Sequence, residues 1–92
     1  MKTVWKFPLG VADSQVILLP KGAKILSVAV QMNIPCIWAM VDSSETQKES
    51  RTILMRGTGH PANGAENAKF LGTVILYNGQ IVFHIFDADG AE

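Results

Sequence analysis

The pair Asn78-Gly79 constrains the fold of this chain more than any other feature, because it joins two strongly apolar segments. Asn-Gly is the preferred pair for a two-residue type I′ hairpin turn, in which both residues take a positive φ. Such a turn sets the register of the flanking segments, so residues 70–86 are predicted to form an antiparallel hairpin. The residues that should face each other are Tyr77 and Gln80, Leu76 and Ile81, Ile75 and Val82, Val74 and Phe83, Thr73 and His84, and Gly72 and Ile85.

Both faces of this hairpin are predicted to be apolar. One face would carry Val74, Leu76, Ile81, Phe83 and Ile85. The opposite face would carry Leu71, Ile75, Val82 and Phe86, with Thr73 and His84 among them. An antiparallel hairpin with one face in water normally alternates apolar and polar residues. Either a second layer covers the second face, or that face meets another subunit through Leu71, Ile75, Val82, His84 and Phe86.

The rest of the chain also reads as short strands with period-two alternation. The predicted strands cover residues 3–9, 15–19, 24–31, 36–42 and 51–56, and in 24–31 the side chains of Leu26, Val28 and Val30 share one face. With the hairpin this makes about seven strands, and no segment predicts a convincing helix. The fold prediction is all-β: one compact domain of 92 residues, a hairpin-connected antiparallel β-sandwich or small barrel.

Three segments interrupt the strand pattern. Residues 42–50 contain no apolar side chain and predict a solvated loop. Residues 56–69 hold several glycines and Pro61 and predict a second loop. Residues 87–92 are mostly polar and predict a frayed C-terminal tail.

The second loop is the leading candidate for a small-molecule site. Gly57 and Gly59 could expose backbone amides to an anion, and Arg56 carries a fork that fits carboxylate or phosphate. Thr58 and His60 could donate hydrogen bonds. The segment lacks the Lys-Ser/Thr ending of a P-loop. The alternative is a strand exit that only needs the turning capacity of glycine.

No catalytic or metal centre is predicted. His84, Asp87 and Asp89 do not have a recognised metal-ligand spacing. Cys36 lies in an apolar strand, where a free cysteine is usually a buried core residue. A pairing of Cys36 with His60 or His84 as a nucleophile stays open, because the sequence does not show their proximity. We therefore expect a protein that is not an enzyme and has no cofactor.

The composition limits the partners. Eight basic and eight acidic residues give a formal net charge of zero, whereas binding to a nucleic acid duplex needs an excess of Lys and Arg. Hydrophobic residues make up 48% of the chain and charged residues 17%, which favours a homo-oligomer with apolar surface in its interface. No run is long enough to span a membrane, and the single cysteine fits a reducing compartment. These observations predict a cytoplasmic protein that does not contact a membrane.

Several segments together resemble a family of small, uncharacterised proteins from bacteriophages and bacteria. In chain order they are WKFPL (residues 5–9), LPKGAKILSV (19–28), PCIWAMVD (35–42), GTGHP (57–61) and VFHIF (82–86). The resemblance covers nearly the whole chain and implies no catalytic residue. It implies a phage or prophage accessory protein that acts in the bacterial cytoplasm by binding.

Two functions are consistent with these observations. The first is a non-enzymatic module that sequesters a small anionic, nucleotide-like ligand of host defence at Arg56, Gly57, Thr58, Gly59 and His60. The second is a protein-interaction module that uses the second face of the hairpin to inhibit a host protein or to serve as a virion component.

Overall fold

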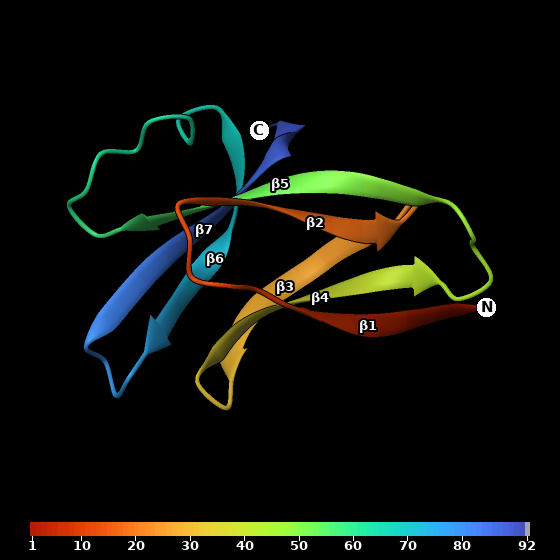
Figure 1. Ribbon diagram of the computed structural model, residues 1–92, viewed down its shortest axis with the longest axis horizontal. Coiled ribbons are helices and arrows are strands. Elements are labelled where there is room, and N and C mark those ends of the chain that lie inside the picture. The colour runs from red at the N-terminus through yellow and green to blue at the C-terminus, as the bar shows by residue number, and fades with distance from the viewer. Residues whose placement is uncertain (92) are drawn as a thin grey trace.

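The structure, a computed structural model, describes residues 1–91 and contains seven antiparallel strands and no helix in that range (Figure 1). The strands are β1 (Lys2–Pro8), β2 (Ser14–Pro20), β3 (Lys24–Gln31), β4 (Ile34–Asp42), β5 (Lys48–Gly57), β6 (Ala68–Leu76) and β7 (Ile81–Ala91). The predicted number of strands and the all-β class are confirmed.

The strands form two sheets that pack against each other as a sandwich. One sheet has three strands in the order β1-β4-β3, and the other has four in the order β2-β5-β7-β6. β3 of the first sheet lies against β6 of the second, but the two strands are not hydrogen-bonded into one sheet. The fold is therefore a sandwich and not a closed barrel. In the described chain, only the β3–β4 and β6–β7 connections are hairpins between paired strands. The β1–β2, β2–β3 and β4–β5 connections cross from one sheet to the other, and the β5–β6 connection stays in one sheet but passes over β7.

The β6–β7 hairpin has the register predicted from Asn78-Gly79. The pairs from Gly72 with Ile85 to Leu76 with Ile81 all occur as predicted. Asn78 and Gly79 have φ values of 55° and 89°, as a type I′ turn requires. Tyr77 also has a positive φ, which the sequence did not indicate. The Gln80 amide donates to the Tyr77 carbonyl over 3.1 Å and closes the turn.

Two β-bulges change the faces that simple alternation predicts. The register shifts between Ile25 and Ser27 and again between Phe70 and Gly72, so Leu26 and Leu71 are the extra residues. A bulge moves the following side chains to the opposite face. Leu26 is consequently exposed while Ile25 and Val28 pack inward, and Leu71 packs against the core. The predicted common face of Leu26 and Val28 is wrong for this reason.

The core lies between the two sheets and consists of two clusters. The larger is built on Leu9, Ile37, Ile53, Met55, Val74 and Ile85. The smaller is built on Leu19, Ala23, Ala39 and Val41. Their members alternate along each strand, because every second residue of a strand points to the same face. The partly buried Phe7, Ile17 and Ile25 pack against both clusters and join them.

Two predicted irregular segments belong partly to strands. β5 begins at Lys48, so the first loop ends before it rather than at residue 50. β7 continues to Ala91, so residues 87–91 are not a frayed tail, and Glu92 lies outside the described residues. Asp87 explains why β7 continues beyond residue 86. It is only 2% exposed and accepts a 2.6 Å hydrogen bond from Arg51 Nη1. Asp87 is thus polar because it belongs to a buried ion pair, whereas Asp89 of the same segment is exposed.

Candidate functional site

The glycine loop leaves β5 through a tight turn. The His60 amide donates to the Gly57 carbonyl over 3.1 Å, and Gly59 has a φ of 82°. A positive φ at the third residue of a turn favours glycine. Gly57 is closely packed, because a Cβ there would lie 2.8 Å from Nδ1 of His60 and the exposed ring would have to shift. The imidazole ring therefore packs directly on the backbone of Gly57.

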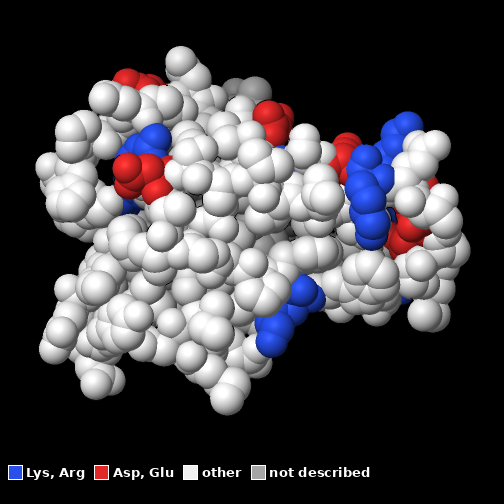
Figure 2. Space-filling view, viewed as in Figure 1, with Lys and Arg blue, Asp and Glu red and all other residues white. Residues whose placement is uncertain are grey.

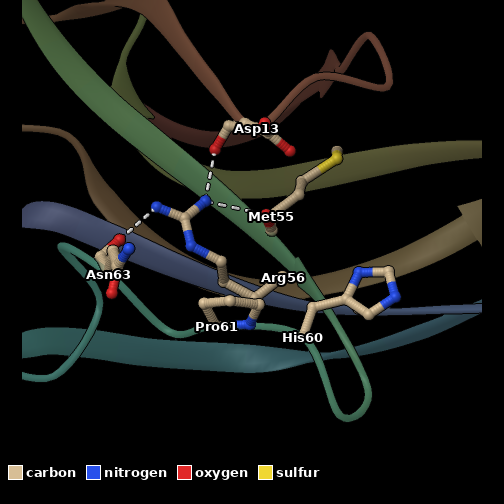
Figure 3. Close-up of a pocket in the computed structure, with 7 residues that line it drawn as sticks. Asp13, Met55, Arg56, His60, Pro61 and Asn63 are labelled. Carbon is tan, nitrogen blue, oxygen red and sulfur yellow. Dashed lines mark hydrogen bonds between the residues drawn. The ribbon is translucent and has the colours of Figure 1, made fainter.

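Arg56 holds the loop in place with its guanidinium group. Its Nη1 donates to the carbonyl oxygens of Asp13 and Met55 at 2.7 Å and 2.8 Å, and its Nη2 donates to that of Asn63 at 2.5 Å. Figure 3 shows the guanidinium between Asp13 and Asn63, with the ring of His60 directed away from it. Three of the five N–H donors of an arginine are thus engaged with backbone carbonyls. The group predicted to bind an anion joins two loops to β5.

A cleft of about 300 Å³ lies beside this arginine. Its walls are formed by Asp13, Met55, Arg56, Gly57, His60, Pro61 and Asn63. Asp13 contributes an acidic side chain to the same cleft as Arg56, so the lining has no excess of positive charge. The ring nitrogens of His60 have no hydrogen-bond partner among the described residues. The cleft can offer a ligand the imidazole and any donor of Arg56 that the carbonyls leave free.

Thr58 and His84 connect the glycine loop to the β6–β7 hairpin. The hydroxyl of Thr58 lies 2.7 Å from Nε2 of His84, and the hydroxyl of Thr73 lies 2.9 Å from its Nδ1. A neutral imidazole has one N–H donor and one acceptor nitrogen, so one threonine donates to the ring and the other accepts from it. Residues predicted separately as ligand site and interface are therefore joined in one network.

A second, shallow groove of about 510 Å³ adjoins this network. It is lined by Gly57, Thr58, His60, Gln80, Ile81, Val82 and Phe83. Gly57 and His60 line both depressions, so the predicted loop site and the hairpin form a continuous surface. Gly59 lines neither depression and lies at the turn, with open space around its α-carbon.

The predicted interface residues are divided between two environments. Leu71 packs inward against the core, because the bulge places it there. Ile75 is 57% exposed, whereas Val82, His84 and Phe86 are partly buried. Phe86 meets Phe70 in an edge-to-face arrangement with ring centroids 5.4 Å apart. Among the five predicted interface residues, Ile75 is therefore the most exposed.

The turns of the two hairpins meet at one end of the molecule and form an apolar surface. Oδ1 of Asn33, in the β3–β4 turn, accepts a 2.9 Å hydrogen bond from the amide of Tyr77. Five exposed apolar side chains lie in these two turns or within two residues of them, namely Met32, Ile34, Ile75, Tyr77 and Ile81. Ile75 is on the outer face of the hairpin, and Ile81, which is paired with Leu76, is on the other face. We call these five residues the hairpin-end patch. Figure 2 shows no Lys, Arg, Asp or Glu at the tips themselves, at the lower left of the face in view. Beside the β3–β4 turn, Nζ of Lys6 donates to Oε1 of Gln31 over 2.7 Å.

A model of one protein family, described as domain of unknown function (DUF7352), matches residues 1–92. The chain belongs to the DUF7352 family. No curated protein and no solved structure matches it. The family match assigns no role to any residue of this DUF7352 domain.

Sequence reasoning missed the hairpin-end patch, although a signal was present. Residues 25–41 and 70–86 contain no Asp, Glu, Lys or Arg, and each range contains one of the two hairpin turns. The strands of these uncharged segments account for much of the core, which hides the signal at the turns. Met32 shows the difference, since its side chain is 90% exposed despite its apolar character.

The residues considered for nucleophilic or metal chemistry are not gathered into one cluster in the described part of the DUF7352 domain. Cys36 is buried on β4 of the three-stranded sheet, and its thiol lies 3.4 Å from the Ile34 carbonyl oxygen as a weak donor. His84 lies on the four-stranded sheet, and His60 lies in the loop that leaves it, so the structure does not join either to Cys36. No group of three or more His, Cys, Asp or Glu is placed to hold a metal ion among these residues. The same residues also form no helix that is long and apolar enough to cross a membrane.

The carboxyl group of Asp42 has a clearly shifted pKa, but Asp42 does not line the cleft. Its pKa is lowered to about 2. The side-chain hydroxyl of Ser44 is the largest cause, followed by the Ser44 amide and the N-terminal ammonium group 3.2 Å away. Hydrogen bonds to a carboxylate favour its charged form. Asp42 thus caps the turn after β4 and has no contact with the candidate site.

Proposed function

We propose that this DUF7352 domain is a non-enzymatic protein-interaction module that binds a partner protein through the hairpin-end patch. The observation that carries the proposal is that two uncharged turns, joined by the Asn33–Tyr77 hydrogen bond, have five exposed apolar side chains in them or within two residues of them. The centre of a protein–protein interface is typically depleted of charged residues and enriched in apolar and aromatic ones. An exposed apolar patch of this kind often marks such an interface.

The geometry of the two turns supports binding with little loss of conformational freedom. The β3–β4 turn has two residues between its paired strands, and the β6–β7 turn has four. Met32, Asn33, Tyr77 and Asn78 in these turns all have positive φ values. The Asn33–Tyr77 hydrogen bond also joins the turn of one sheet to the turn of the other. A surface that is already ordered loses less entropy when it binds than a flexible one.

The resemblance of the sequence to small phage and bacterial proteins supports a narrower form of this proposal. The module would be a phage-encoded accessory protein in the bacterial cytoplasm, and its partner would be a host protein, such as a component of a defence system. The partner surface would be apolar and largely uncharged, because charged groups left unpaired against the hairpin-end patch would lose their hydration without compensation.

We expect Ile75→Glu and Met32→Glu to abolish capture of the partner from a lysate of producing cells. A charge in the centre of an apolar interface costs at least 1.4 kcal/mol, or about tenfold in affinity, when it is buried without a partner. The measurement is quantitative mass spectrometry of proteins retained by the immobilised domain. Both residues are exposed, so the variants should unfold at about the wild-type temperature.

Val11→Glu is the matched control for this experiment. Val11 is 60% exposed and lies between β1 and β2, outside the two uncharged segments. The wild type and Val11→Glu should retain the same protein, and the two patch variants should lose it. Equal retention by all four proteins, or no specific protein retained by the wild type, would contradict the proposal.

A second candidate function is capture of a small ligand in the cleft at Arg56 and His60. The cleft of about 300 Å³ favours it, because Arg56 and the exposed His60 both line that cleft. Native mass spectrometry of the domain taken directly from producing cells tests it, with His60→Ala as the variant. A ligand mass carried by the wild type and lost in His60→Ala is the expected result. A wild type without added mass, or a mass that His60→Ala keeps, would exclude the cleft as the site.

A further inference from the structure

The two sheets have four edge strands, β1, β3, β2 and β6. Edge strands expose unpaired backbone groups, and proteins normally protect them with lysine, proline, bulges or a covering element. β1 carries Lys2, Lys6 and Pro8. β3 and β6 each contain a bulge and a lysine, and they lie against each other. Three of the four edges are therefore protected.

β2 has none of these protections along its length. Its sequence, SQVILLP, contains no charged residue, its register with β5 is continuous, and its proline is the last residue. No other described strand runs along its free side. On the outer face Val16 is 63% exposed and Leu18 is 62% exposed. β2 therefore combines a regular unpaired backbone with apolar side chains in solvent.

We propose that β2 is a dimerisation edge that pairs antiparallel with β2 of a second copy of this chain. The pairing would join the two four-stranded sheets into one continuous sheet of eight strands. A two-fold axis at Ile17 would place Val16 opposite the partner's Leu18, and Leu18 opposite the partner's Val16. Neighbouring apolar side chains of this kind stabilise antiparallel strand pairs.

The charges at the two ends of β2 favour a second copy as the occupant. Asp13 precedes the strand and Lys21 follows it. In the same two-fold register Asp13 comes opposite the partner's Lys21, and Lys21 comes opposite the partner's Asp13. The interface is thus uncharged at its centre and has opposite charges at each end, so this register is self-complementary.

The dimer would leave the hairpin-end patch accessible. β2 and β6 are at opposite edges of the four-stranded sheet, and the patch lies at the β6–β7 turn. The inference does not depend on the proposed function, because it concerns a different surface. If both hold, the dimer presents two patches and gains avidity for a partner with repeated sites.

Analytical ultracentrifugation of the full chain over a range of concentrations tests the proposal. We expect a monomer–dimer equilibrium whose dissociation constant rises at least tenfold in Val16→Lys and in Leu18→Lys, because a lysine on each copy faces an apolar neighbour and raises the charge of the interface. Val4→Lys is the control, since Val4 is an exposed apolar residue of the protected edge strand β1. It should leave the equilibrium unchanged.

A charge exchange tests the register. Asp13→Lys should weaken the dimer, because two lysines then face each other, and Asp13→Lys combined with Lys21→Asp should restore it. A wild type that stays monomeric at every concentration would overturn the proposal. So would a dimer that survives both lysine substitutions in β2, a dimer that Val4→Lys also disrupts, or a monomer that instead pairs β2 with a strand of another protein.

Discussion

Replacing Asp87 with alanine is expected to destabilise the fold by about 3 kcal/mol, the low end of the cost of breaking a buried ion pair. The carboxylate of Asp87 accepts hydrogen bonds from Arg51 Nη1 at 2.6 Å and from the amides of Asp89 and Gly90 at 2.9 Å and 3.1 Å. Its removal leaves the Arg51 guanidinium, largely shielded from water, without its main partner. For a domain of this size the midpoint of thermal unfolding should fall by roughly 10–20 °C, which calorimetry measures.

Two further variants separate the ion pair from the hydrogen bonds to the backbone. Asp87→Asn keeps an oxygen for the two amides but removes the charge opposite Arg51, so its loss of stability should be intermediate. Asp89→Ala is the matched control, because exposed Asp89 accepts one hydrogen bond from the Thr52 amide and should cost about 1 kcal/mol. An Asp87→Ala protein as stable as Asp89→Ala would show that the buried pair does not hold the end of β7.

Gly72→Ala should destabilise the sandwich by roughly 1–3 kcal/mol, the usual cost of overpacking a core. A Cβ at position 72 would lie 2.6 Å from Cγ2 of Val28, at the place where β6 meets β3. Valine cannot move aside easily, because branching at Cβ restricts its χ1 rotation. Gly72 therefore sets the distance between the two sheets, and chemical denaturation measures the loss.

The double variant Gly72→Ala with Val28→Ala should recover part of this loss. Removing the valine methyl groups relieves the clash, but the φ of 157° at position 72 still disfavours a residue with a Cβ. Gly10→Ala is the control, because Gly10 does not have a positive φ and a Cβ there would lie 3.9 Å from its nearest neighbour, Oε1 of Gln15. If Gly72→Ala is as stable as Gly10→Ala, then close packing of the sheets does not depend on this glycine.

These structural variants bear on function through the position of the hairpin-end patch. The patch takes residues from both sheets, so its shape depends on how the sheets are placed relative to each other. The Gly72–Val28 contact and the Asn33–Tyr77 hydrogen bond both connect β3 or its turn with β6 or its turn. A change at Gly72 is therefore expected to weaken partner capture as well as stability.

The candidate site was predicted in part. The sequence indicated a turn at Gly57 to His60 and a facing pair of Thr73 and His84, and both occur. It could not indicate that Arg56 reaches the carbonyl oxygens of Asp13 and Asn63, because those contacts depend on where two loops are placed by the fold. The charge of an arginine is visible in a sequence, but the partners that occupy its donors are not.

The sequence by itself determined the all-β class, the number of strands and the register of the β6–β7 hairpin. These features follow from local chemistry, namely the positive φ accepted by Asn78-Gly79 and the period-two alternation of apolar side chains. Only the tertiary structure decided the order of strands in the two sheets, the bulges at Leu26 and Leu71, and the inclusion of residues 87–91 in β7. Each depends on contacts between residues far apart in the chain. A polar residue such as Asp87 predicts a solvated tail until the fold brings Arg51 to it.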